Sequence, residues 1–235
     1  MTDRRELYTG ISGGRVLDVG TGRGGFVEEL IAELKDCDEI IGIDIDGDLS
    51  EGFRKRFADY PRVKFQQADA LSLPFEDESF DTVSVAGSLH HLADPQIGLR
   101  EMMRVLRSGG HLIQVEMYRD GQSETQQTHV MLHHWWAAID RLGGTVHRET
   151  YTRGEVVDLV NDLDLSRLTM RDESYLDQDP RNPEQLAQLQ SSIDQYIHRA
   201  TGRADLVAQG TEIRGRLRRV GFHGATVLVA VGQKR

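Results

Sequence analysis

A glycine-rich segment near the N-terminus, VLDVGTGRGGF, contains the first residues whose types and spacing could do chemistry. Gly20, Gly22 and Gly24 lack a Cβ, so the backbone can turn tightly there and approach a ligand closely. A helix is expected to follow, and the unpaired N–H groups at a helix N-terminus attract negative charge. The segment therefore predicts a turn that binds a small molecule between a strand and a helix.

Two carboxylates near this turn narrow the class of ligand. Asp44 ends the second expected strand, where a carboxylate can accept hydrogen bonds from both hydroxyls of a ribose. Glycines 20, 22 and 25 also fit the dinucleotide fingerprint, so the turn alone leaves a nicotinamide cofactor open. Asp18 lies inside the first strand, where a buried carboxylate needs a partner. It would repel a pyrophosphate but attract the ammonium and sulfonium of S-adenosylmethionine.

A histidine pair and a glutamate follow two later strands. His90 and His91 come after the fourth expected strand, and Glu116 ends the fifth. Histidine titrates near neutral pH, so either ring could remove a proton from an acceptor hydroxyl. Glu116 could orient a histidine or bind a cationic substrate. Packing or capping roles for the histidines, and an ordinary strand-end role for Glu116, stay open.

Further histidines lie on a later helix beside Trp135 and Trp136. His129 and His133 are one turn apart on that helix, and Glu116 or Asp120 could complete a metal site. The spacing lacks the glutamate of a zinc protease, so we predict no metal site. An aromatic substrate wall and ordinary packing are the favoured interpretations of this segment.

Short apolar runs alternate with helical periodicity along the chain, which predicts a parallel sheet covered by helices. We expect strands at 15–20, 39–45, 63–69, 80–86, 111–117, 165–173 and 225–231. We expect helices at 26–34, 49–60, 96–107, 124–142, 153–163, 186–200 and 204–220. Gly109 and Gly110 are interpreted as the break that ends the third helix.

Four segments in this order resemble the class I S-adenosylmethionine-dependent methyltransferases, in particular the small-molecule group related to the ubiquinone-pathway enzymes (methyltransferase type 11). VLDVGTGRGG is similar to the first motif of that family, GIDID to the second and FQQADALSLPF to the third. FDTVSVAGSLHHLADP and REMMRVLRSGGHLIQVE are similar to the fourth strand, its helix and the fifth strand. The resemblance implies an α/β fold with a Rossmann-like seven-stranded, mostly parallel sheet, helices on both faces and an antiparallel last strand.

The resemblance also implies which residues bind the cofactor, S-adenosyl-L-methionine. The first turn would hold its methionine end, and the end of the second strand its ribose. Residues after the third strand would frame the adenine, and residues after the fourth would lie under the sulfonium. These four groups are Asp18, Gly20, Thr21, Gly22 and Gly24; Asp44 and Ile45; Ala68, Asp69 and Ala70; and Ala86, Gly87 and Ser88. Some O-methyltransferases of the family carry a similar histidine pair, which makes His91, or failing that His90, the expected base.

One departure from the family concerns the last two strands, which the family usually joins by a tight hairpin. Residues 174–224 intervene here, so we expect an extra helical segment near the C-terminus. Together with the helix at 124–142, it is expected to cover the cofactor cleft and shape the acceptor pocket. We expect one methyltransferase domain over 1–235, divided into a cofactor-binding half (1–120), a helical cover region with strand six (121–224) and a final strand (225–235).

Composition limits the partners. The formal net charge is -10, which disfavours nucleic acid and anionic membranes because both are negatively charged. No apolar run approaches the length of a membrane span, and the N-terminal residues lack the apolar core of a secretory signal. We therefore expect a cytoplasmic protein with a small-molecule acceptor. The oligomeric state stays open.

These observations predict an S-adenosylmethionine-dependent methyltransferase that acts on an unidentified small molecule. Two alternatives remain open, a protein that binds S-adenosylmethionine without turnover and an NAD(P)-dependent oxidoreductase. The second is disfavoured by Asp18 and by the lack of a visible Tyr-x-x-x-Lys pair. The acceptor atom is not predicted.

Overall fold

The computed structural model describes residues 4–235, which fall into two compact units. Unit 1 contains the described residues up to 116, Val156–Asp172 and Leu228–Arg235. Unit 2 contains Met117–Glu155 and Glu173–Val227. The chain passes between the units at four points, so most of strand six belongs to unit 1 rather than to the helical unit.

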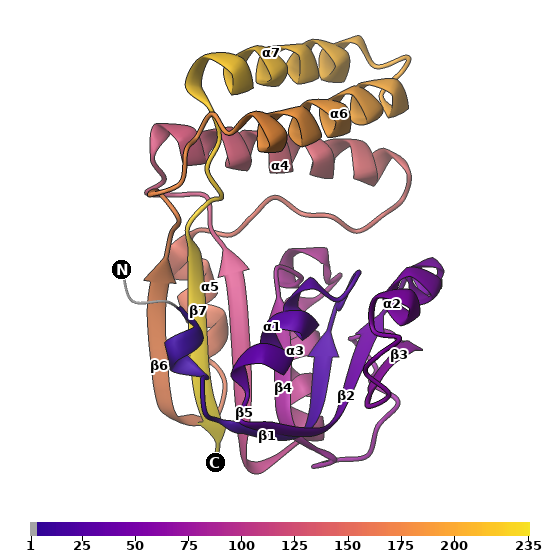
Figure 1. Ribbon diagram of the computed structural model, residues 1–235, viewed down its shortest axis with the longest axis vertical. Coiled ribbons are helices and arrows are strands. Elements are labelled where there is room, and N and C mark those ends of the chain that lie inside the picture. The colour runs from indigo at the N-terminus through magenta and orange to yellow at the C-terminus, as the bar shows by residue number, and fades with distance from the viewer. Residues whose placement is uncertain (1–3) are drawn as a thin grey trace. The chain divides into compact units, whose positions relative to one another are not determined.

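Within the described residues, unit 1 is built on a seven-stranded sheet in the order β3-β2-β1-β4-β5-β7-β6. The strands are β1 (Ser12–Val19), β2 (Asp36–Asp44), β3 (Val63–Gln67), β4 (Phe80–Ala86), β5 (Leu106–Met117), β6 (Leu165–Glu173) and β7 (Val227–Lys234). β1 pairs in parallel with β2 and β4, β2 with β3, and β4 with β5. β7 runs antiparallel between β5 and β6 (Figure 1). The predicted α/β fold with its antiparallel last strand is therefore confirmed.

The central strands are buried on both faces, which is why their sequences run apolar without alternation. Val16, Leu17 and Val19 of β1 are fully buried, and the 40–43 segment of β2 is buried throughout. Asp18 is the one charged residue in the buried part of β1, and its carboxylate is only 1% exposed.

β5 begins five residues earlier than predicted, because Gly109 and Gly110 lie inside the strand instead of ending a helix. Its pairing with β4 shifts register at this point, from Phe80 opposite Leu106 to Thr82 opposite His111. Gly109 has φ +76, and a Cβ on Gly110 would lie 2.7 Å from the carbonyl oxygen of Asp81. The two glycines therefore form an irregularity in the strand and not a break.

Helices flank the sheet of unit 1. They are α1 (Gly25–Glu33), α2 (Ser50–Arg56), α3 (Pro95–Val105) and most of α5 (Arg153–Asn161). α3 begins where the Asp94 carboxylate accepts a hydrogen bond from the Ile97 amide at 3.0 Å, with Pro95 in its first turn. This cap fixes the residue at which α3 begins, after the loop that follows β4.

Unit 2 is a bundle of three helices that lie side by side (Figure 1). They are α4 (Glu124–Leu142), α6 (Pro183–Arg199) and α7 (Ala204–Val220). Their apolar faces share one core that includes Trp135, Ile193 and Ile213, all fully buried. α6 and α7 are the extra helical segment expected between the last two strands.

No helix among the described residues combines the length and the apolar character needed to cross a membrane.

Candidate functional site

The glycine-rich turn joins β1 to α1 and is held by neighbouring strands. Gly20, Gly22 and Gly24 all have positive φ, between +54 and +82, which other residue types rarely adopt. The amide of Thr21 donates to the Ile43 carbonyl at 2.8 Å. A Cβ on Gly20 would lie 2.5 Å from the Ser88 hydroxyl oxygen, so the segment after β4 and the turn approach as closely as glycine allows.

Asp18 presents an unsatisfied carboxylate oxygen beneath this turn. Its Oδ1 accepts a hydrogen bond from the Ser84 hydroxyl at 2.7 Å, whereas Oδ2 has no hydrogen-bond partner among the described residues. Burial raises the pKa of Asp18 to about 6, the hydroxyls of Thr21 and Ser84 partly oppose this, and the charge of Asp44 adds to it. A buried, partly satisfied carboxylate of this kind is suited to a cationic group.

Asp44 lies at the carboxyl end of β2 and ties that strand to the turn. Its Oδ2 accepts a hydrogen bond from the Gly22 amide at 2.9 Å, and its Oδ1 accepts one from the Asp46 amide at 3.0 Å. Each oxygen retains a further lone pair. The next residue, Ile45, is 69% exposed, which is unusual for a large apolar side chain beside a buried strand.

The residues after β3 and β4 lie at the same edge of the sheet, because these are carboxyl ends of parallel strands. The Ala68 amide donates to the Asp44 carbonyl at 3.0 Å. Asp69 is exposed, and its carboxylate accepts from the Leu71 amide at 2.9 Å. After β4, the Ser88 hydroxyl is 3.0 Å from both the Gly20 and the Ala86 carbonyl oxygens, so it can donate to either. Ala70 is buried, and Gly87 is exposed with φ +58.

His90 and Glu116 form a buried pair at this edge. His90 Nδ1 lies 2.9 Å from Glu116 Oε1, and the other carboxylate oxygen accepts from the Leu89 amide at 2.9 Å. Their side chains are 3% and 0% exposed. A neutral His90 that donates its Nδ1 proton to Glu116 has its basic lone pair on Nε2. His91 is exposed, and its ring centroid lies 4.3 Å from that of His90.

The structure does not assemble the metal set considered from the sequence. His129 Nδ1 accepts from the Ala225 amide at 2.8 Å, and the Asp120 carboxylate accepts from the Arg153 amide at 2.7 Å. Of the two interpretations favoured for this segment, ordinary packing holds for Trp135 and an aromatic substrate wall does not. That side chain lies in the core of unit 2 and donates its indole N–H to the Leu206 carbonyl at 2.9 Å.

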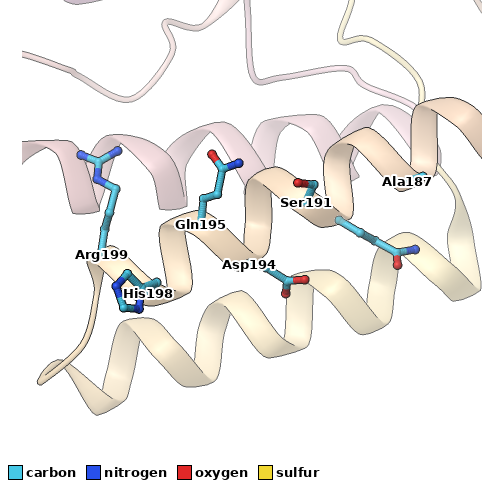
Figure 2. A pocket seen from close by; sticks show the side chains of 7 residues that line it. Ala187, Ser191, Asp194, Gln195, His198 and Arg199 are labelled. Atoms are coloured by element: carbon cyan, nitrogen blue, oxygen red, sulfur yellow. The ribbon is translucent and has the colours of Figure 1, made fainter.

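A shallow hollow on unit 2 lies along α6 (Figure 2). All of its lining residues come from that helix, among them Asp194, His198 and Arg199. None of them belongs to the predicted site. One face of a single helix brings no second element toward a ligand, so this hollow is not a candidate active site.

In comparison with known proteins, a family model matches the part of the chain that contains most of the candidate site residues. Residues 17–114 match the model of a methyltransferase domain. The ubiquinone/menaquinone biosynthesis C-methyltransferase UbiE of Geotalea daltonii is 37% identical over 106 residues, which are 44% of this chain and 45% of that protein. A demethylmenaquinone methyltransferase of Clavibacter sepedonicus is 36% identical over 103 residues, which are 44% and 41% of the two chains. The matched part therefore spans less than half the length of these relatives.

Solved structures extend the similarity to the whole chain at the level of the fold. The YcgJ protein of Bacillus subtilis has a TM-score of 0.61 at 21% identity, with 98% of this chain and 96% of that chain covered. A phosphoethanolamine N-methyltransferase of Haemonchus contortus, solved with S-adenosylhomocysteine and phosphomonomethylethanolamine, has a TM-score of 0.60 at 15% identity. The alignment covers 98% of this chain and 51% of that one.

Proposed function

We propose that this protein, whose residues 17–114 belong to the methyltransferase domain family, transfers a methyl group from S-adenosylmethionine to a small-molecule acceptor. The observation that carries the proposal is the buried Asp18 carboxylate, with one oxygen unpartnered, under a turn of three left-handed glycines. A pyrophosphate would be repelled at this position, whereas an ammonium or a sulfonium would be attracted. The chemistry of the residues present therefore fits S-adenosylmethionine better than a dinucleotide.

The other residues at the strand ends fit the remaining parts of the cofactor. Asp44 would accept hydrogen bonds from the ribose, because its oxygens keep lone pairs beyond those used by Gly22 and Asp46. Ile45 offers exposed apolar surface to the adenine. Asp69 would accept from the adenine amino group, with Ala68 and Ala70 beside it. The methionine end would lie against Asp18 and the turn formed by Gly20, Thr21, Gly22 and Gly24, and the sulfonium over Ala86, Gly87 and Ser88.

His90 is the residue that we propose as general base where the acceptor is a hydroxyl. When bound, S-adenosylmethionine supplies an electrophilic methyl group. Glu116 holds the His90 ring through Nδ1, so that a proton can be taken at Nε2. His91 was the first choice from the sequence, but its side chain is exposed, whereas His90 is buried against Glu116. The rest of the rate would come from alignment of the acceptor with the methyl carbon.

Calorimetry tests the cofactor directly. We expect S-adenosylmethionine and S-adenosylhomocysteine to bind and NAD not to bind. Asp44→Ala should weaken binding by about 1.5–3 kcal/mol, the scale of hydrogen bonds to a charged group. Asp38→Ala, on the exposed opposite end of β2, is the matched control and should bind as the parent does. Tight NAD binding with no response to S-adenosylhomocysteine would end the methyltransferase proposal.

We further propose a small-molecule acceptor without nucleic-acid or membrane partners, a cytoplasmic location, and a single methyltransferase domain. The name of the UbiE relative, a C-methyltransferase, makes an activated carbon the acceptor class to test first.

A further inference from the structure

Unit 2 contains a pair of buried histidines that the proposed methyl transfer does not use. His133 lies on α4, and His147 lies in the segment without helix or strand that follows it. They are 7% and 5% exposed. Their Nε2 atoms are 3.2 Å apart, and the two rings meet nearly edge to face at 79°.

A carboxylate fixes the chemical state of one of these rings. His147 Nδ1 lies 2.8 Å from Asp140 Oδ2. Asp140 is itself held by Arg199 at 2.6 Å and by the hydroxyl of Tyr196 at 3.3 Å. Burial opposes ionisation of Asp140, but the hydrogen bonds from His147 and Arg199 outweigh it and lower its pKa. Asp140 is therefore an anion that can accept a hydrogen bond from Nδ1 of His147. In the tautomer that donates this bond, the lone pair of His147 lies on Nε2.

This arrangement matches the surroundings of a metal-binding histidine. In metal sites, a ligating imidazole commonly donates its other ring N–H to a carboxylate, which fixes the tautomer and raises ligand basicity. Two imidazole nitrogens bound to one tetrahedral zinc ion lie about 3.3 Å apart, given Zn–N bonds of about 2.0–2.1 Å. The observed separation of 3.2 Å between the Nε2 atoms is close to that value.

We propose that His133 and His147 bind a divalent transition-metal ion through their Nε2 atoms, with Asp140 as the positioning residue for His147. Zinc is the ion that best suits two imidazoles in a site without thiolates. Water or a bound small molecule would supply the remaining ligands. The sequence pattern on α4 had singled out His129 with His133, but His147 was not visible because a loop residue carries no periodicity.

Both tryptophans of the chain give this site a spectroscopic probe. Trp135 and Trp136 lie two and three residues after His133 on α4. Bound Co²⁺ or Cu²⁺ quenches nearby indole fluorescence, so we expect saturable quenching of the metal-free protein. Competition between the protein and a chelating dye for Zn²⁺ should show the same site. Zn²⁺ should also displace Co²⁺ and restore the fluorescence.

Variants decide whether the two histidines are the ligands. His133→Gln and His147→Gln should each remove one equivalent of bound metal and the associated quenching. His198→Gln, an exposed histidine on α6 in the same unit, is the matched control and should leave both unchanged. If circular dichroism shows that His133→Gln does not fold, His147→Gln decides alone, because it changes a loop. Equal stoichiometry and quenching in the parent and in His147→Gln would overturn the proposal, as would the absence of binding to the parent.

The Asp140→Asn variant tests whether Asp140 positions His147 for the metal or only packs against it. Loss of an outer carboxylate typically costs 10–100-fold in metal affinity, so we expect weakening of about that size in a folded variant. Unchanged affinity in folded Asp140→Asn would show that Asp140 does not act through His147, and the proposal of a carboxylate-supported site would fail.

Discussion

The buried carboxylate of Asp18 lowers the stability of the folded protein, and the same carboxylate is proposed to bind the cofactor. Its pKa is raised from 3.8 to about 6, so the folded chain holds this proton more tightly than the unfolded chain does. Between those two pH values folding takes up a proton, and the contribution of Asp18 to the free energy of unfolding falls as pH rises. Above about pH 6, the stabilising contribution of protonated Asp18 is fully lost. A shift of two pKa units corresponds to about 3 kcal/mol.

Asp18→Asn should therefore stabilise the cofactor-free protein and weaken cofactor binding. At pH 7.5 we expect the variant to unfold at higher denaturant concentration than the parent, by up to about 3 kcal/mol, and the difference should vanish near pH 4. Affinity for S-adenosylmethionine should fall, because asparagine offers no charge to the ammonium or sulfonium. In the parent, affinity should decrease as pH drops through about 6. Denaturant titrations and calorimetry across this pH range measure both effects.

An unchanged affinity in Asp18→Asn would contradict the role assigned to the carboxylate. A variant that is less stable than the parent at pH 7.5 would show instead that the hydrogen bond from Ser84 matters more than the buried charge.

Variants of His90 and His91 test which of the two histidines acts as the general base. His90→Asn should lower turnover by a factor of about 10²–10⁴ with nearly unchanged cofactor affinity, the usual value of general-base catalysis. Glu116→Gln should lower turnover and alter its pH profile, because Glu116 orients the His90 ring. His91→Asn is the control and should keep most of the activity. Full activity in both single histidine variants and in the double variant would show that alignment alone suffices, as for a thiolate or carbanion acceptor.

At the residue scale, the sequence could place the glycines, Asp18 and Asp44 around one turn, because each belongs to a motif with a fixed spacing. Their roles in binding stay predictions. The sequence placed His91 before His90, because it does not show which of the two rings meets a carboxylate. The two residues lie in a single turn of 3-10 helix, where side-chain direction changes sharply from one residue to the next. The choice depends on Glu116, which is distant in sequence and close in space.

At the scale of elements, α4 and α7 approach closely at one glycine. A Cβ on Gly210 would lie 2.3 Å from Cζ2 of Trp135, which is fully buried and hydrogen-bonded. The ring cannot move aside without breaking its bond to the Leu206 carbonyl or displacing the core. Gly210 therefore sets the distance between these two helices.

Gly210→Ala should destabilise unit 2 despite the better helix propensity of alanine. Overpacking of this kind costs about 1–3 kcal/mol, which exceeds the gain of about 1 kcal/mol from replacing a helical glycine. Gly215→Ala on the same helix is the control. Its Cβ would meet only the far end of the flexible Arg219 side chain, so it should be neutral or stabilising. Unfolding followed by tryptophan fluorescence reports on this unit; equal stabilities for the two variants would contradict the close approach.

The bounds of a helix or strand were predictable where its local sequence pattern agrees with the structure that it adopts in the fold. α4, α7, β4 and β6 have the predicted bounds, because amphipathic or apolar runs define them. β5 was predicted too short, since glycine is a helix breaker locally but serves here as a strand irregularity that depends on β4. α6 begins at Pro183 and not at residue 186, because the Asn182 side chain caps the Glu184 and Gln185 amides.

At the scale of the whole molecule, the chain builds two cores. Unit 1 buries the apolar strands of the sheet, and unit 2 buries the inner faces of α4, α6 and α7 around Trp135. The sequence predicted a helical segment between the last two strands, yet it could not predict that this segment joins α4 in a core of its own. Such a core depends on contacts between helices that are far apart in sequence, and amphipathicity alone does not name the partner.

Because the chain builds two cores, we can predict which amides cofactor binding protects from hydrogen exchange. A ligand that binds only the folded form of unit 1 stabilises it by about 2.7 kcal/mol at a free concentration of 100 times Kd. All proposed cofactor residues lie in unit 1, so S-adenosylhomocysteine should slow amide hydrogen exchange in β1, β2, β4 and the glycine turn. Amides of α6 and α7 should exchange at unchanged rates, because local opening of the three-helix core involves none of those residues.

Tryptophan fluorescence, which reports only on α4, provides an independent check during thermal unfolding with and without ligand. Equal additional protection in α6 and α7 would mean that the two cores open together, and the chain would then behave as one cooperative unit despite its division into two.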